Sequence, residues 1–286
     1  MTYDFNIGTY SFKISTSSED AQIWFDRGLI WAYGFHWEEA VTCFKESVKA
    51  DPKCAMSWWG VAYAVGPYYN RMWHQLDEIE LPNILTECFK ASQTALKLCD
   101  EVTSLEKDLI FALSKRHPSD QAPEDFSLWN DNYAQAMRDM NKKYPDNPDV
   151  SSLFAEAIMS RTPWQLWDLS TGLPKEGAST IEAKETLENA IDNVERNGSH
   201  PHAGLLHYYI HVMEMSPIPE AALRAGDLMR TLVPDCGHLL HMPTHIDFQC
   251  GNYNDVVARN SEAIEADKKV IERDGILNLF ASSVIH

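Results

Sequence analysis

The spacing of small and aromatic residues in one N-terminal segment constrains the fold more than any other feature of the sequence. Residues 21–54 read AQIWFDRGLIWAYGFHWEEAVTCFKESVKADPKC, and residues 55–66, AMSWWGVAYAVG, begin the same pattern again. Gly28 and Ala40 are small at positions where two packed helices approach closely. Pro52 ends the second helix, because proline disfavours helical backbone at the residue before it. The segment therefore predicts a helix–turn–helix unit that repeats every 34 residues.

The 34-residue unit matches the pattern of a tetratricopeptide repeat (TPR). With Ala21 as position 1, the signature positions carry Trp24 (4), Gly28 (8), Trp31 (11), Ala40 (20), Phe44 (24) and Pro52 (32). No segment alternates apolar and polar residues over more than a few positions, as a half-buried strand would. We therefore predict an all-α fold, a TPR-like α–α superhelix of antiparallel helix pairs that forms a single domain over residues 1–286.

The predicted domain has three parts that differ in regularity. An N-terminal TPR spans residues 21–66, irregular helical pairs span residues 67–200, and histidine-rich TPR-like pairs span residues 201–275. In the middle part, helical periodicity recurs between segments rich in proline and glycine. The helices predicted there cover residues 82–98, 103–115, 126–143, 150–161 and 179–197.

The C-terminal part returns to the 34-residue register. One repeat begins at Ala203 and the next at Gly237, with Gly251-Asn-Tyr-Asn as the turn inside the second repeat. After Asp274 the chain continues into an apolar tail, GILNLFASSVIH. A repeat array normally closes with a helix whose outer face is polar. The tail is therefore expected to pack back, to pair with another subunit in a homodimer, or to mark a shortened chain.

The net charge argues against two classes of partner. The chain has 24 Lys and Arg against 42 Asp and Glu, a formal charge of −18. Such an acidic protein repels nucleic-acid phosphates and anionic lipids, and it attracts cations. The sequence has no apolar run of about 18 to 20 residues, no signal-peptide pattern and no CxxC pair among its 6 cysteines. We predict a cytoplasmic protein with reduced thiols that binds neither nucleic acid nor membrane.

Histidines gather in the C-terminal part of the chain. Of the 11 histidines, seven lie between residues 200 and 245. His207, His211 and Glu214 stand at i, i+4 and i+7 in the segment GLLHYYIHVMEMSP. Since a helix turns by about 100° per residue, these three side chains are expected to share one stripe.

A second histidine pair occupies the same place in the next repeat. His241 lies 34 residues after His207, and His245 lies 34 residues after His211. Equivalent positions in stacked repeats face the same way, and packed helices lie about 8 to 10 Å apart. Pro243, between the second pair, is expected to bend the helix and change how the two rings aim. The four imidazoles are therefore predicted to converge in the concave groove of the superhelix.

Imidazole nitrogens together with a carboxylate suit a divalent transition metal such as Fe, Cu or Zn. The predicted metal ligands are His207, His211, Glu214, His241 and His245. Glu214 is either a ligand or a catalytic general base, and the sequence does not choose between them. The alternative is that these are ordinary packing or surface histidines, since HxxxH is common on helices by chance.

Further residues are candidates for a pocket near the histidines. They are His238, Glu156, Trp164, Tyr69 and Trp73. His238 shares the stripe of His241 and His245, and it could support a ligand, line an entrance or be structural. Glu156 could add a carboxylate or be an ordinary residue of a helix surface. Aromatic residues at helical spacing belong more often to a core than to a pocket.

Four segments of this chain resemble a family of TPR-domain proteins of bacteria and fungi, most of which are known only as TPR proteins. The segments are WFDRGLIWAYGFHWEEAVTCFKESVKADPKCAMSWWGVAYAVGPYYN, PWQLW, HYYIHVMEMSPIPEAA and GHLLHMPTHI. The resemblance covers nearly the whole chain, and the two histidine blocks are its specific parts. It implies a TPR-like α-superhelix whose hallmark residues are His207, His211, Glu214, His241 and His245.

The chain departs from that family in two places. Relatives read FNHEEA where this chain has Phe35-His36-Trp37-Glu38-Glu39-Ala40, which displaces a histidine by one position. Relatives also continue into further helices with another histidine block. If that block supplies ligands, a 286-residue chain lacks part of the site.

Two functional classes follow from these patterns. The first is a metalloenzyme that acts on a small molecule, with an oxidoreductase favoured over a hydrolase. The second is a non-enzymatic TPR scaffold that binds a peptide in its groove. A metal chaperone or sensor would use the same ligands as the enzyme with an exchangeable metal and no turnover.

Overall fold

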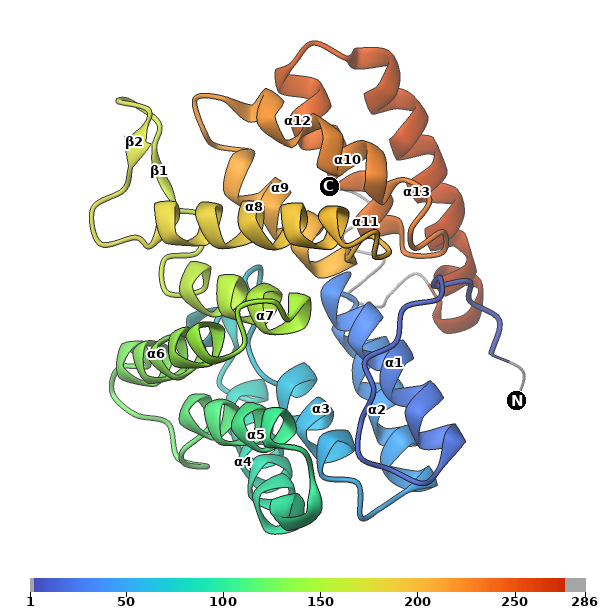
Figure 1. The fold of residues 1–286 in the computed structure, drawn as a ribbon, viewed down its shortest axis with the longest axis vertical. Coiled ribbons are helices and arrows are strands. Elements are labelled where there is room, and N and C mark those ends of the chain that lie inside the picture. Colours follow the sequence, from blue (N-terminus) through green and yellow to red (C-terminus); the bar gives the residue numbers. More distant parts are fainter. Residues whose placement is uncertain (1–2, 276–286) are drawn as a thin grey trace.

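The computed structural model describes residues 3–275, and Figure 1 shows their helices following one another along the chain. The helices are α1 (Glu19–Tyr33), α2 (Trp37–Ala50), α3 (Ala55–Val65), α4 (Glu80–Leu98), α5 (Ser104–Arg116), α6 (Ser127–Lys143), α7 (Pro148–Met159), α8 (Thr180–Arg196), α9 (Ala203–Met213), α10 (Leu223–Met229), α11 (Gly237–His241), α12 (Pro243–Gln249) and α13 (Tyr253–Asp274). The strands are β1 (Trp167–Asp168) and β2 (Leu173–Pro174). The predicted all-α, TPR-like fold is confirmed.

The first predicted repeat forms the helix pair α1–α2, and α3 begins the next one. A Cβ atom at Gly28 would lie 2.8 Å from the ring of Phe44, so the close approach of the two helices requires glycine. Ala40, on α2, is completely buried. The small residues that predicted this helix pair therefore lie where the two helices touch.

The five helices predicted in the middle of the chain correspond to α4 to α8, with every end within two residues of its prediction. Local sequence signals explain this agreement. Thr103 and Glu106 form a reciprocal capping box at the start of α5. Asn147 caps α7, whose first residue is Pro148.

One short hairpin was not predicted. Trp167 pairs with Pro174 and Asp168 with Leu173, and Gly172 takes a positive φ of 70° in the connection. Strands of two residues are too short to produce an alternating sequence pattern. The indole of Trp167 donates a hydrogen bond to the carbonyl of Val212 (2.6 Å), which holds the hairpin against α9.

In the second C-terminal repeat, the first helix divides into α11 and α12 with Met242 between them, and Pro243 is the first residue of α12. Proline is well accepted at a first helical position, because that residue's N–H has no partner within the helix. The helix is thus interrupted at one residue before Pro243, although Met242 keeps helical dihedrals (φ −51°, ψ −39°). The predicted turn also lies between α12 and α13, with Gly251 at a φ of 78°.

The two ends of the described chain meet. The backbones of Asn6 and Asp235 are hydrogen bonded (3.0 Å), and the Asp235 carboxylate accepts from the N–H of Asn6 (2.6 Å). Arg273, at the end of α13, pairs with Glu39 on α2. In Figure 1 the blue first repeat accordingly lies beside the lower end of the red α13. As a result, α9 packs on α1 as well as on α7, α8 and α10.

None of the helices in the described part of the chain is long and apolar enough to cross a membrane. Within that part, the 6 cysteines form no disulfide. The predicted role of the C-terminal tail concerns residues 276–286, which lie outside the described residues.

Candidate metal centre

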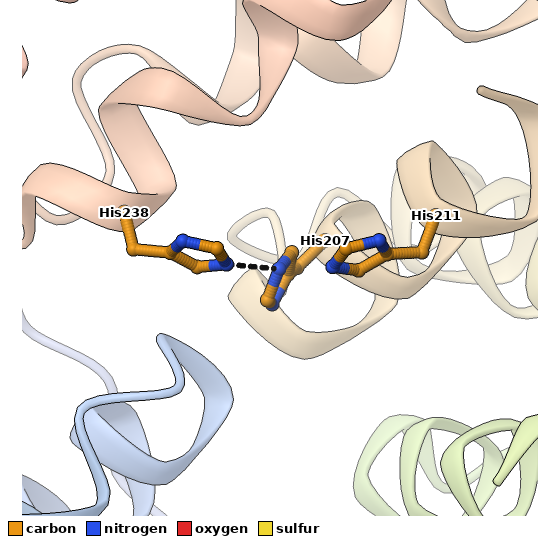
Figure 2. Close-up of side chains that lie close together, drawn as sticks. All are labelled: His207, His211 and His238. Carbon is orange, nitrogen blue, oxygen red and sulfur yellow. Dashed lines mark hydrogen bonds between the residues drawn. The ribbon is translucent and has the colours of Figure 1, made fainter. Parts of the chain in front are cut away.

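Three imidazoles lie together where α9 meets α11. His207 and His211 project from α9 and His238 from α11, and one nitrogen of each lies within 4.8 Å of the others. Figure 2 shows the ring of His207 between those of His238 and His211. This group differs from the predicted ligand set. It includes His238, which was predicted only as a pocket residue, and it does not include Glu214, His241 or His245.

His207 is fixed by a backbone group of the first repeat. Its Nδ1–H donates to the carbonyl oxygen of Tyr33 (2.5 Å), since a carbonyl can only accept. Its Nε2 faces the Nε2 of His238 at 3.1 Å, so one of these two nitrogens donates to the other. Burial, followed by repulsion from the neighbouring imidazoles, lowers the pKa of both His207 and His238 well below 6.5. Both rings therefore prefer the neutral form, which is the form that binds metals.

The ring of His211 is held by the side chain of Glu214, at the C-terminal end of the same helix. Its Nδ1 lies 2.8 Å from Oε1 of Glu214, the residue that follows the last turn of α9. Its Nε2 is buried and has no hydrogen-bond partner among the described residues. A buried polar nitrogen without a partner is uncommon in proteins. This nitrogen is the atom of His211 that a ligand would contact.

Glu214 links the three-histidine group to the second predicted pair. Its Oε1 accepts from His211, and its Oε2 lies 2.7 Å from Nδ1 of His245. Burial by itself raises the pKa of the Glu214 carboxyl, but His211 and then His245 lower it to about 2. The carboxylate is therefore ionised at neutral pH and lies on the Nδ1 side of both rings.

The second predicted pair, His241 and His245, forms a group of its own. Their Nε2 atoms are 3.0 Å apart, and Nδ1 of His241 lies 2.7 Å from Oδ1 of Asn260 on α13. Both rings are partly exposed, whereas His207 and His211 are buried. The five predicted ligands therefore lie in two neighbouring groups rather than in one, and every side chain of α9 is buried rather than lining an open groove.

Aromatic rings surround the three histidines. Phe35 stacks on His211 (centroids 5.5 Å apart) and on His238 (5.4 Å). Tyr69 lies 5.1 Å from His211, and Trp164 meets the same imidazole edge to face at 5.6 Å. Tyr69 and Trp164, both predicted as pocket residues, are thus placed beside the candidate metal centre.

Two of these aromatic residues have unusual backbones. Phe35 has a φ of 56° and Trp164 a φ of 60°, and among the described residues no other non-glycine residue has a positive φ. Such a conformation disfavours side chains with a Cβ and persists only where surrounding contacts enforce it. The backbone N–H of Trp164 donates to the hydroxyl of Tyr69 (3.1 Å), which is one such contact.

Two predicted pocket residues have other roles. Glu156 is completely buried and forms a two-pronged ion pair with Arg116 (3.1 and 3.2 Å), so it is neither a surface residue nor part of the histidine group. Trp73 packs in a separate apolar cluster against Phe126 and Trp129. Both residues occupy helical or turn positions whose sequence pattern could not distinguish a pocket from a core.

No sequence pattern indicated the contribution of the first repeat to this group of residues. Tyr33 supplies only a backbone carbonyl, and Phe35 is one of many aromatic residues in its segment. They reach α9 because the ends of the chain meet, a contact between residues 174 positions apart. Of the residues that the ligand prediction omitted, His238 is the one with a sequence signal, because it shares a helical stripe with His241 and His245.

No family model matches the chain, and no curated protein matches it in sequence. Among solved structures, the chain is similar to a chain of Naa15/Naa10 bound to HypK-THB, with 17% identity and a TM-score of 0.32 over 93% of this chain and 34% of that one. It thus spans about a third of that neighbour. It is also similar to yeast Tom70, with 12% identity and a TM-score of 0.42 over 97% of this chain and 70% of that one. Both likenesses concern helical architecture, and neither bears on function.

Proposed function

We propose that the chain binds a transition-metal ion through His207, His211 and His238. The observation that carries this proposal is the gathering of three imidazole nitrogens within 4.8 Å of one another at a largely buried position. A metal ion could bind all three after small side-chain movements, because metal–nitrogen bonds are about 2.0 to 2.1 Å long. The hydrogen bond between His207 and His238 would then be replaced by bonds to the metal.

The hydrogen bonds on the far side of two rings support this assignment. The Tyr33 carbonyl accepts from Nδ1–H of His207, and Glu214 accepts from Nδ1–H of His211. Each neutral ring therefore keeps a lone pair on Nε2. Metal-binding histidines are commonly held in this way, by a backbone carbonyl or a carboxylate on the other nitrogen. We assign Glu214 the role of orienting His211 rather than that of a ligand or catalytic base.

Three imidazoles suit Fe, Cu or Zn and leave coordination positions for water, O2 or a substrate. We propose that the protein is a metalloenzyme acting on a small molecule, with an oxidoreductase favoured over a hydrolase. Such a metal would supply redox chemistry, or a bound hydroxide in the case of zinc. Phe35, Tyr69 and Trp164 would exclude water around it and present flat apolar surfaces to the substrate.

The experiment that tests metal binding is elemental analysis of untagged protein purified without chelator. We expect about one equivalent of Fe, Cu or Zn, lost in the His207→Ala/His211→Ala variant and kept in the His200→Ala variant, whose histidine is exposed in a loop. Circular dichroism would verify that the double variant keeps its helices. Unchanged metal content in that variant would refute the site.

A scaffold for protein–protein interaction is the second candidate, because a TPR-like fold without a cofactor most often serves that purpose. Wild-type protein that contains no metal and takes up none on titration would support the scaffold. A protein that exchanges its metal readily and shows no oxygen consumption with small aromatic molecules would instead be a metal chaperone or sensor.

A further inference from the structure

The His241–His245 pair lies outside the three-histidine group and has a geometry of its own. The ring of His241 comes from the end of α11 and that of His245 from α12, on either side of the break at Met242. Their centroids are 4.9 Å apart with the ring planes at 80°, and their Nε2 atoms face each other at 3.0 Å. Because Met242 keeps helical dihedrals, the i, i+4 spacing of the two residues brings their imidazole nitrogens to one point.

The partners of the other two nitrogens determine which atoms carry the protons. Nδ1 of His245 faces Oε2 of Glu214, an ionised carboxylate oxygen that can only accept, so Nδ1 is the donor. Nδ1 of His241 faces the amide oxygen Oδ1 of Asn260, which also accepts. In neutral rings, both Nε2 atoms then carry lone pairs. Two lone pairs 3.0 Å apart repel each other unless a cation lies between them.

The separation of the two nitrogens also fits a metal. Two nitrogens bound at about 2.1 Å and at right angles to each other lie about 3.0 Å apart, which is the distance found here. The formal charge of −18 and the buried carboxylate of Glu214 further favour a cation. The positions of the two proton donors and the nitrogen separation thus agree with a bound cation.

We propose that His241 and His245 bind a second transition-metal ion, distinct from the one assigned to His207, His211 and His238. The two ions would be neighbours, since the rings of His238 and His241 are 6.4 Å apart. Glu214 would connect the two sites, with Oε1 on His211 and Oε2 on His245. Among the described residues this site has two nitrogen ligands against three in the first, so we expect it to be the weaker site. The second site uses different histidines from those of the proposed function, so either proposal can be refuted without the other.

Titration of the metal-free full-length chain with Zn²⁺ or Cu²⁺ tests this inference, with stoichiometry read by calorimetry. We expect two equivalents in the wild type, one tight and one at least tenfold weaker. The His241→Ala/His245→Ala variant should lose only the weaker equivalent, and His207→Ala/His211→Ala only the tighter one. His200→Ala is the matched control, because its imidazole is exposed in a loop.

The outcomes separate the two proposals. If the wild type binds one equivalent and His241→Ala/His245→Ala still binds it, the second site is overturned and the first one stands. The Nε2 atoms of His241 and His245 would then share a proton instead of binding a metal. One equivalent that is lost only in His241→Ala/His245→Ala would support the pair and refute the three-histidine site. If a double variant does not fold, Cu²⁺ electron paramagnetic resonance of the wild type decides. Two sets of nitrogen couplings, or signal loss through coupling of two ions, support the second site, and one uncoupled set overturns it.

Discussion

The same histidine spacing produces different surroundings in α9 and in α11–α12. In α9 the helix is continuous, both rings are buried, and His207 donates to a backbone carbonyl from α1. In α11–α12 the helix is broken before Pro243, both rings are partly exposed, and His241 faces a side chain of α13. The difference arises from the neighbours, because α9 is covered by α1, α7, α8 and α10. The repeat register places side chains at equivalent positions on successive helices, but the helices packed around them determine which residues each side chain contacts.

The beginnings of these two helices differ in the same way. At α9, His202 accepts from the N–H of Leu205 and donates to Asp149 (3.1 Å), which also accepts from Tyr33 (2.8 Å) and from Tyr10. At α11, the N-cap residue Cys236 makes no side-chain cap, and the carboxyl of Asp267 instead accepts from the backbone of Gly237. Burial by itself raises the pKa of both the Asp149 and the Asp267 carboxyl. At Asp149, however, His202 and the two hydroxyls lower the pKa below its ordinary value, whereas the pKa of Asp267 reaches about 7.

Replacement of Asp149 should have the largest effect on this comparison. Asp149→Ala leaves two buried donors, on Tyr33 and His202, and the partly buried hydroxyl of Tyr10 without an acceptor, so we expect a loss of about 3 kcal/mol in the free energy of unfolding at pH 7. Because the folded state lowers the pKa of Asp149, its stabilising contribution is present above about pH 4 and is lost as pH falls further. Chemical denaturation at pH 7 measures the first effect, and denaturation at about pH 2 measures the second.

The control for this prediction is Asp146→Ala, a change at an exposed position nearby. It should alter stability by less than about 0.5 kcal/mol. An equally small loss in Asp149→Ala would show that the buried hydrogen bonds at the start of α9 contribute little.

Replacement of Glu214 should weaken both histidine groups together. Glutamine offers one oxygen in place of two, so it cannot accept from both His211 and His245. We expect Glu214→Gln to weaken metal binding by about 10- to 100-fold, as loss of a ligand-orienting group typically does. Calorimetric titration measures this change, with the exposed Glu185→Gln as the control. If Glu214→Gln bound metal with wild-type affinity, Glu214 would not orient the ligands of either site.

Replacement of Asp267 should have the smallest effect and the opposite sign. Its folded pKa, about 7, lies above its ordinary value of 3.8, so the folded state binds the proton more tightly. Wild-type stability should therefore fall as pH rises from about 4 to 7, and Asp267→Asn should remove that slope. At pH 8 we expect a gain of about 1 kcal/mol or more in Asp267→Asn, since each pKa unit corresponds to about 1.4 kcal/mol. Denaturation at pH 5 and pH 8 measures the slope, with the exposed Glu272→Gln as the control. Parallel slopes in the wild type and Asp267→Asn would contradict the prediction.

Local sequence patterns are sufficient to predict the helices and their register. Capping residues such as Thr103 and Asn147, the small Gly28 and Ala40, and the break at Pro243 all act through neighbours within one helix or one helix pair. Such short-range effects are encoded in local spacing and can be predicted without the fold. The same holds for the one-sided placement of His207 and His211 on α9.

Which histidines lie together depends on the tertiary structure. Sequence spacing placed His207, His211, His241 and His245 around one metal, but the fold joined His238 to the first two and left the others as a separate pair. It also brought the Tyr33 carbonyl and the Phe35 ring to α9 from the other end of the chain. These contacts depend on how the ends of the superhelix meet. That geometry is the sum of many small helix-packing angles, which no single segment of the sequence specifies.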